Sequence, residues 1–212
     1  MPRPQGQRQR ESFHERRERR GAIDDPAIVL NAAARFLEVR SRSVGEVRRH
    51  LTQAGYRAEM AEAAVVRLTE LGMLDDATFA RMWVESRDRA RPRSEAALRR
   101  ELALKGIDRE LAAEVLFERR SGGEDALGRV SDAGDAGDDD AQRDGPDLAA
   151  AERLLGKRSR ALERIADPRA RRQRAYALLA RNGFDPEVCR EATNRLFTPG
   201  PEPAADPGAW ED

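Results

Sequence analysis

Cysteine, histidine and aromatic residues are scarce in this chain, and each scarcity excludes a class of site. Its one cysteine, Cys189, cannot form an intrachain disulfide or a cysteine zinc cluster. Two histidines, His14 and His50, are too few for a histidine metal triad and suggest no Ser/His/Asp arrangement. Aromatic residues make up 5% of the chain, which favours thin helical units over a sheet protein. We expect Cys189 to be a small residue at a core edge rather than a reactive thiol.

Long apolar runs and nucleotide-binding loops are also missing. No run approaches the length of a membrane span, and the Arg-rich start of the chain lacks the apolar stretch of a signal peptide. We therefore expect a cytoplasmic protein without membrane partners. There is no Gly-x-x-x-x-Gly-Lys-Ser/Thr loop, so nucleotide hydrolysis is unsupported. The adjacent carboxylates Asp75 and Asp76 fit a helix N-cap better than a metal or acid/base site. We predict a protein that is not an enzyme and needs no metal or cofactor.

Charge is abundant and unevenly distributed. Charged residues make up 37% of the chain, the mean hydropathy is −0.78, and the formal net charge is zero. Residues 121–146 hold eight acidic and two basic residues, so the remainder carries a net charge of +6. We predict a disordered basic arm over 1–21, a disordered acidic linker over 121–146 and a disordered acidic tail over 198–212. The linker lacks the closing Glu of an EF-hand, so calcium binding is not expected.

A leucine four residues before a glycine, followed by a large apolar residue, occurs three times in this chain. The three copies are Leu51/Gly55/Tyr56, Leu102/Gly106/Ile107 and Leu179/Gly183/Phe184. The first two glycines are 51 residues apart and the next two are 77 apart, and removing the 26 residues of 121–146 restores the spacing of 51. Such a period predicts stacked supersecondary units.

Capping signals divide these units into helices. Asp25-Pro26, Ser43-x-x-Glu46, Ser94, Asp108, Asp167-Pro168 and Asp185-Pro186 mark helix starts, and Gly55, Gly72, Gly106 and Gly183 mark helix ends. We predict an all-α, elongated tandem array of nine helices in three helix-turn-helix-like, three-helix repeats. The repeats cover residues 22–74, 75–120 and 147–197. One helix of the third repeat is expected to run from Leu148 through Ile165.

Basic residues gather at the start and along the second helix of each repeat, and nearly all are arginine. The candidate binding residues are Arg40, Arg42, Arg48, Arg49, Arg91, Arg93, Arg99, Arg100, Lys105, Lys157, Arg158, Arg171, Arg172 and Arg174. A positive stripe fits a charged polymer, either nucleic acid phosphates or a protein filament. The simpler alternatives are a genome-wide preference for arginine and a solvated face paired with nearby acids, as Glu46 could pair with Arg49.

Several motifs together resemble the RecX regulators of the bacterial RecA recombinase. They are Arg40-x-Arg42-Ser43-x-x-Glu46, Leu51-x-x-x-Gly55-Tyr56, Leu71-Gly72-Met73-Leu74-Asp75-Asp76-x-x-Phe79-Ala80, Arg91-Pro92-Arg93-Ser94 and Leu102-x-x-Lys105-Gly106-Ile107. The resemblance covers residues 27–120 strongly and 147–197 more loosely. The long acidic segment and the extended arm and tail depart from the family pattern.

The resemblance implies a function in homologous recombination, DNA repair and the SOS response. Family members are curved arrays of three-helix repeats that bind in the groove of the RecA filament on single-stranded DNA. They limit filament extension, ATPase activity and strand exchange, and also contact single- and double-stranded DNA. We expect a monomeric modulator of this kind. Two alternatives stay open: a helix-turn-helix DNA-binding regulator, and a repeat scaffold for another protein.

Overall fold

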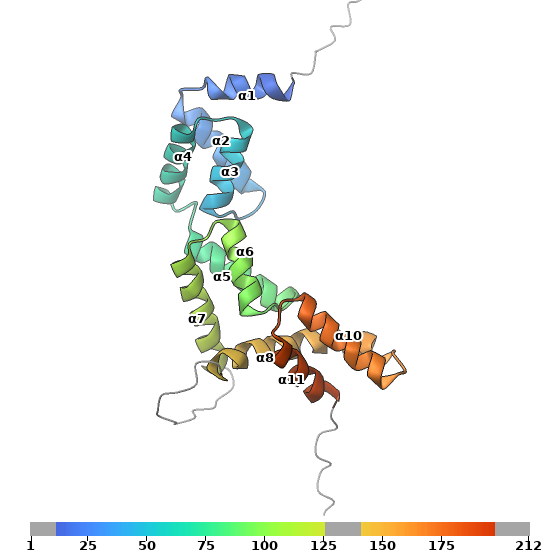
Figure 1. The fold of residues 1–212 in the computed structure, drawn as a ribbon. Coiled ribbons are helices and arrows are strands. Elements are labelled where there is room, and N and C mark those ends of the chain that lie inside the picture. The colour runs from blue at the N-terminus through green and yellow to red at the C-terminus, as the bar shows by residue number, and fades with distance from the viewer. Residues whose placement is uncertain (1–11, 126–140, 198–212) are drawn as a thin grey trace, which may run out of the picture. The chain divides into compact units, whose positions relative to one another are not determined.

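The computed structural model describes residues 12–125 and 141–197, and this part of the chain is entirely helical with connecting turns. Its helices are α1 (Phe13–Gly21), α2 (Pro26–Glu38), α3 (Val44–Ala54), α4 (Ala58–Glu70), α5 (Asp76–Ala90), α6 (Glu95–Lys105), α7 (Arg109–Asp125), α8 (Ala141–Gly156), α9 (Ser159–Glu163), α10 (Pro168–Arg181) and α11 (Pro186–Phe197) (Figure 1). The predicted all-α class is confirmed. None of the described helices is long and apolar enough to cross a membrane.

The predicted number of nine helices is wrong, because the described residues form eleven. One additional helix is α1, which occupies Phe13–Gly21 within the segment expected to be a disordered arm. Ser12 and Glu15 start it with a capping box, a signal that the polar composition of the arm concealed. The other additional helix is α9, because the expected helix from Leu148 through Ile165 is interrupted between Gly156 and Ser159.

The structure has helical residues at both ends of the predicted acidic linker. Helix α7 runs to Asp125 and α8 begins at Ala141, so both helices extend into residues 121–146. The expected disorder of the rest of this segment, and of the tail over 198–212, concerns residues outside the described ranges. The limits of the three repeats stay a prediction.

The chain is divided into two compact units, and residues of the middle repeat belong to both. One unit holds the residues up to Met82 together with Leu102–Ala112, and the other holds Trp83–Glu101 together with the residues from Ala113 on. The first unit has a core from α2, α3 and α4, in which Val29, Val47 and Leu51 are fully buried. The second has a core from α8, α10 and α11 that includes Leu155, Leu179 and Cys189. Burial raises the pKa of the Cys189 thiol to about 11, so it is un-ionised at neutral pH.

The predicted helix boundaries are largely confirmed, because each depends on contacts within a few residues. Ser43 and Glu46 form a capping box at α3, and Asp25 and Asp167 accept backbone N–H groups at the starts of α2 and α10. Of the adjacent acids, Asp75 is the cap of α5, since its carboxylate accepts from the N–H groups of Ala77 and Thr78. The closing glycines all have positive φ: 104° at Gly55, 68° at Gly72, 84° at Gly106 and 89° at Gly183.

Candidate functional site: two repeated junctions and the exposed arginines

In the first unit, the amino end of α3 meets the carboxyl end of α6, and we call this contact the first junction. Ser43 is fully buried and its Oγ donates to the backbone carbonyl of Lys105 at 2.6 Å. The first helical residue, Val44, donates its N–H to Asp76 Oδ1 at 2.8 Å. Both bonds use polar groups at helix ends that have no partner inside their own helix. Helix termini are thus joined end to end through hydrogen bonds.

Gly45 and Gly106 allow the two backbones of the first junction to approach. A β-carbon on Gly45 would lie 2.8 Å from the Lys105 carbonyl oxygen and 2.9 Å from the α-carbon of Gly106. Both neighbours are backbone atoms, so no side-chain movement could relieve the clash. Gly106 additionally has the left-handed conformation that residues with a β-carbon disfavour.

The second unit contains the same arrangement between α6 and α10, which we call the second junction. Ser94 is 1% exposed and its Oγ donates to the backbone carbonyl of Gly183 at 2.7 Å. The first helical residue, Glu95, donates its N–H to Asp147 Oδ1 at 2.9 Å. A β-carbon on Gly183 would lie 2.9 Å from Cβ of Ala97. Each junction therefore combines a buried serine, a carboxylate that accepts the first helical N–H, and a left-handed glycine.

Charged side chains surround the first junction. Glu46 Oε1 lies 2.9 Å from Arg40 Nη2 and 2.8 Å from Lys105 Nζ. Burial alone would raise the pKa of Glu46, but the hydrogen bonds and charges of Arg40 and Lys105 more than offset it and lower this pKa to about 2. Glu46 was expected to pair with Arg49 in the solvated-face alternative; the structure pairs it with these two bases instead. Arg40 and Lys105, 65 residues apart in the printed sequence, meet at one carboxylate.

Charged side chains also surround the second junction, but there the pKa of the buried carboxylate is raised instead of lowered. Glu95 pairs with Arg99 at 2.7 Å and with Arg120 at 2.8 Å. Burial raises the pKa of Asp147 to about 6, with Glu95 adding to the increase, while the N–H of Glu95 and the guanidinium of Arg119 oppose it. The carboxylate that closes the second junction is therefore partly protonated near pH 6.

Many of the candidate binding residues already interact with other residues of this chain. Arg48 makes two hydrogen bonds with Glu62, at 2.7 and 2.8 Å, and Arg93 Nε lies 2.9 Å from Glu101. Arg42 stacks on the Phe36 ring, with 4.1 Å between its Cζ and the ring centroid. The other engaged candidates have the following partners: Arg91 with Asn182, Arg171 with the Phe197 ring, and Lys157 with the Arg89 carbonyl.

A second group of candidates remains exposed, with no carboxylate partner among the described residues. Its members are Arg49, Arg100, Arg158, Arg172 and Arg174. Arg49 and Arg100 occupy equivalent positions, each six residues before the closing glycine of the second helix in its repeat. These side chains can reach an external anion without breaking an internal ion pair. The alternative of a solvated face paired with nearby acids fits Arg48, Arg93 and Arg99, and it does not fit this second group.

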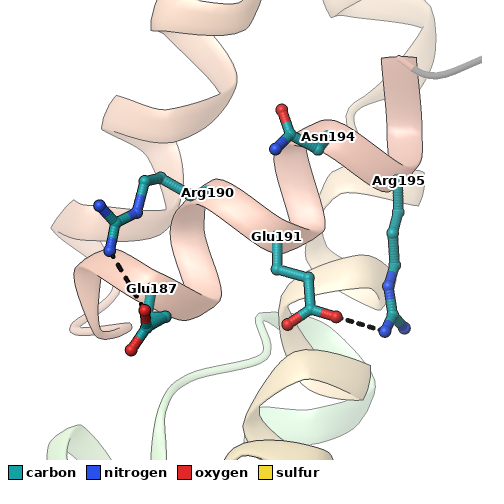
Figure 2. Close-up of a pocket in the computed structure, with 5 residues that line it drawn as sticks. All are labelled: Glu187, Arg190, Glu191, Asn194 and Arg195. Carbon is teal, nitrogen blue, oxygen red and sulfur yellow. Dashed lines mark hydrogen bonds and ion pairs between the residues drawn. The ribbon is translucent and has the colours of Figure 1, made fainter.

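On the exposed face of α11, by contrast, the charged side chains are paired with one another. A shallow hollow there is lined by Glu187, Arg190, Glu191, Asn194 and Arg195. Figure 2 shows Glu187 turned toward Arg190, at 3.5 Å, and Glu191 paired with Arg195. These pairs lie one helical turn apart and leave no unbalanced charge in the hollow. Among the described residues, no group of three or more His, Cys, Asp or Glu side chains could hold a metal ion.

Several residues of the junctions were not among the candidates from sequence. They include Asp76 and Asp147, whose side chains act on helices 32 and 52 residues away. The Asp75-Asp76 pair gave one signal in the sequence. A single carboxylate is enough to cap a helix, so the second one indicated a contact elsewhere in the chain. The arginines of α1 were also missed, because that segment was expected to be disordered.

Comparison with known proteins finds family matches in three segments of the chain. Three family models match, described as the first, second and third three-helix domains of RecX, over residues 30–68, 75–116 and 146–193. The regulatory protein RecX of Prosthecochloris aestuarii is 30% identical over 174 residues, which cover 82% of this chain and 97% of that protein. RecX of Mycolicibacterium smegmatis is 38% identical over 88 residues, covering 42% of this chain and about half, 47%, of that protein.

Solved structures agree on the fold. The crystal structure of RecX from Lactobacillus salivarius has a TM-score of 0.54 and 18% identity, covering 82% of this chain and 97% of that one. A second crystal structure of a regulatory protein RecX has a TM-score of 0.56 and 17% identity, covering 80% and 71%. With its three matching domains and a relative aligned over nearly its whole length, the chain belongs to the RecX family.

Proposed function

We propose that this chain is a non-catalytic inhibitor of RecA recombinase that binds along the groove of a RecA filament on single-stranded DNA. Membership of the RecX family carries the proposal, because its members are named regulatory proteins and the resemblance in the sequence motifs implies RecA as the target. A monomer in the cytoplasm, where RecA and DNA are present, would limit filament extension, ATPase activity and strand exchange, and could contact DNA directly.

The exposed arginines supply the surface for this binding. Arg49 and Arg100 repeat at one position of successive second helices, and Arg172 and Arg174 lie exposed on α10. Arginine forms bidentate hydrogen bonds with carboxylates and phosphates, so it suits either the acidic side chains of a filament or its DNA. Of the neighbouring residues, Arg48 pairs with Glu62 of α4, and Arg99 pairs with Glu95 of its own helix.

The test is the ATPase and strand-exchange activity of RecA on single-stranded DNA with increasing amounts of this protein. The full chain should inhibit both activities. Arg49→Glu with Arg100→Glu should raise the half-inhibitory concentration roughly tenfold or more, since like charge facing a partner costs on the order of 1 kcal/mol or more. Arg35→Glu is the matched control, because Arg35 is also exposed and lies outside the candidate set.

Binding to bare DNA separates this proposal from the helix-turn-helix alternative. Association should be measured with RecA filaments, single-stranded DNA and duplex DNA at rising salt, since phosphate contacts weaken with salt. Tight binding that required a particular duplex sequence, with no effect of RecA, would replace the proposed function with DNA-binding regulation.

A further inference from the structure

The two junctions form a series in which the carboxyl end of a second helix receives the amino end of the preceding one. The carboxyl end of α10 receives α6, and the carboxyl end of α6 receives α3. Among the described residues, α3 is the first second helix of the series, and no helix of an earlier repeat reaches its carboxyl end. That end has the same features as the other two: a backbone carbonyl at Ala54, a left-handed glycine at Gly55 and a large apolar residue at Tyr56.

Helix α1 covers this end of α3 in the structure (Figure 1). Arg20 Nη1 donates to the Ala54 carbonyl at 3.2 Å, and its Cζ lies 5.7 Å from the centroid of the Tyr56 ring. A β-carbon on Gly55 would lie 2.9 Å from the α-carbon of Arg17, so the backbone of α1 lies directly on the glycine. The guanidinium of Arg20 thus takes the carbonyl equivalent to that of Lys105, which Ser43 binds at the first junction. At the second junction Ser94 binds the carbonyl of the glycine itself.

The fit of α1 is much looser than the fit of the internal junctions. No residue of α1 is buried, and Phe13 is 67% exposed. A cavity of about 210 Å³ remains between the two helices, lined by Phe13, Arg16, Arg20 and Ala54. By contrast, Ser43 and Ser94 are buried at the internal junctions. A helix held by so few contacts opens at low free-energy cost.

We propose that the carboxyl end of α3 is a docking site for the amino end of a helix from another protein, and that α1 is its displaceable cover. The internal junctions specify what such a helix must carry. It needs a serine or threonine N-cap, whose hydroxyl binds the Ala54 carbonyl as at the first junction or the Gly55 carbonyl as at the second. It also needs Gly or Ala within the next three residues, where the backbones approach. Within the described ranges, the second helices of another copy of the chain do not offer such an amino end. Ser43 and Ser94 are buried, and α10 begins with Asp167, which already accepts the N–H groups of Arg169 and Ala170.

The first repeat lacks the carboxylate that accepts the first helical N–H at the internal junctions, and this affects which residue the partner helix can have at its first position. Asp25 and Asp75 are equivalent caps, so Pro26 stands at the position of Asp76. Asp76 accepts the N–H of Val44 at the first junction, and proline cannot accept that bond. A docking helix would therefore leave its first N–H without this acceptor, unless its first residue is itself proline, which is common at that position and has no N–H. The expected partner helix begins with Ser-Pro or Thr-Pro.

The probe is a peptide of residues 91–105 carrying Glu95→Pro, held helical by a lactam bridge between the exposed positions 99 and 103. It should be titrated into the full-length protein carrying Arg20→Ala, with the amide resonances of Gly55 and Tyr56 followed by NMR. The resonances should shift saturably, and the apparent Kd should be about tenfold lower than for the unmodified chain if α1 covers the site in roughly nine molecules of ten. Arg16→Ala is the matched control, since it removes the same charge from α1 and leaves the bond to Ala54.

A second peptide separates this site from nonspecific binding. The same sequence with Ser94→Val lacks the hydroxyl and should bind at least several-fold more weakly. Equal binding of the two peptides, shifts confined to Gly183, or equal effects of Arg20→Ala and Arg16→Ala would each overturn the proposal. None of these results depends on RecA, so they test the docking site separately from the proposed inhibition.

Discussion

Glu46 connects three parts of the first unit through one carboxylate. It completes the capping box of α3, binds Arg40 before that helix and binds Lys105 at the end of α6. A buried carboxylate is unfavourable unless it is paired, and here two bases and a backbone N–H supply the pairing. At the second junction the result is the opposite: burial raises the pKa of Asp147 by more than the N–H of Glu95 and the guanidinium of Arg119 lower it.

Glu46 should contribute stability that is lost in acid. Its pKa is lowered to about 2, so its contribution is present above the ordinary value of 4.5 and disappears as the pH falls toward 2. Glu46→Gln should destabilise α3 by about 2–3 kcal/mol at pH 7 and by much less near pH 3. Hydrogen exchange of the Leu51 amide, corrected for intrinsic rates, measures this difference. An equal loss at both pH values would contradict the role of the charge.

Asp147 should have the opposite effect on pH dependence. Its pKa is raised to about 6, so the folded chain keeps a proton that the unfolded chain loses near 3.8, and stability falls as the pH rises between these values. Asp147→Asn keeps an oxygen for the N–H of Glu95 and cannot ionise. Relative to the unmodified chain, it should gain about 2–3 kcal/mol between pH 4 and pH 7. Exchange of the Leu98 amide reports this change, and a constant difference would show that Asp147 is charged throughout.

At the scale of a single helix, α6 carries both buried leucines and exposed arginines. Leu98 and Leu102 are fully buried, while Arg99 and Arg100 lie exposed on other faces. Its amino end donates at the second junction and its carboxyl end accepts at the first. The exposed arginines are consequently presented on a helix that is fixed at both ends.

Replacing Arg99 and Arg100 with Glu should leave helical content unchanged and weaken inhibition of RecA. Arg99 loses its pair with Glu95, but Arg120 still binds that carboxylate. An exposed pair of this type contributes only about 0.3–0.5 kcal/mol. Circular dichroism and the RecA ATPase assay measure the two results. Loss of helical signal would mean that these side chains support the fold, and unchanged inhibition would remove them from the proposed interface.

At the scale of the whole molecule, the described residues bury apolar side chains of the middle repeat, such as Leu98, Leu102 and Leu116, besides two apolar cores. One is built around Leu51 and Val47, and the other around Leu179 and Leu155. Each belongs to one of the two compact units, and the middle repeat contributes helical residues to both units. The three sequence repeats therefore do not correspond to three independent packing units.

Core substitutions should act mainly within their own unit. Leu51→Ala and Leu179→Ala each remove a fully buried leucine and should cost about 2–5 kcal/mol. Hydrogen exchange should show the loss in α2–α4 for the first and in α8, α10 and α11 for the second. Equal deprotection of both cores by either substitution would indicate that the chain unfolds as a single cooperative unit.

Local features of this protein were predictable from sequence because they depend on neighbouring residues. The N-caps at Ser43, Asp25 and Asp167 and the glycine helix ends involve atoms within about four residues, so fixed spacings reveal them. The threefold repeat and the motifs of the RecX family are also properties of spacing. The sequence by itself thus determined the helical class, most helix ends, the repeat and the family resemblance.

Only the tertiary structure decided which helix ends meet and which charges stay exposed. Ser43 bonds to a carbonyl 62 residues away and Ser94 to one 89 residues away, and no local spacing encodes such pairs. The same holds for α1, whose polar composition indicated disorder but whose Arg20 reaches the end of α3. Arginines that look alike in the sequence differ because a carboxylate lies within reach of Arg48 in the folded chain, and the described residues offer none to Arg49.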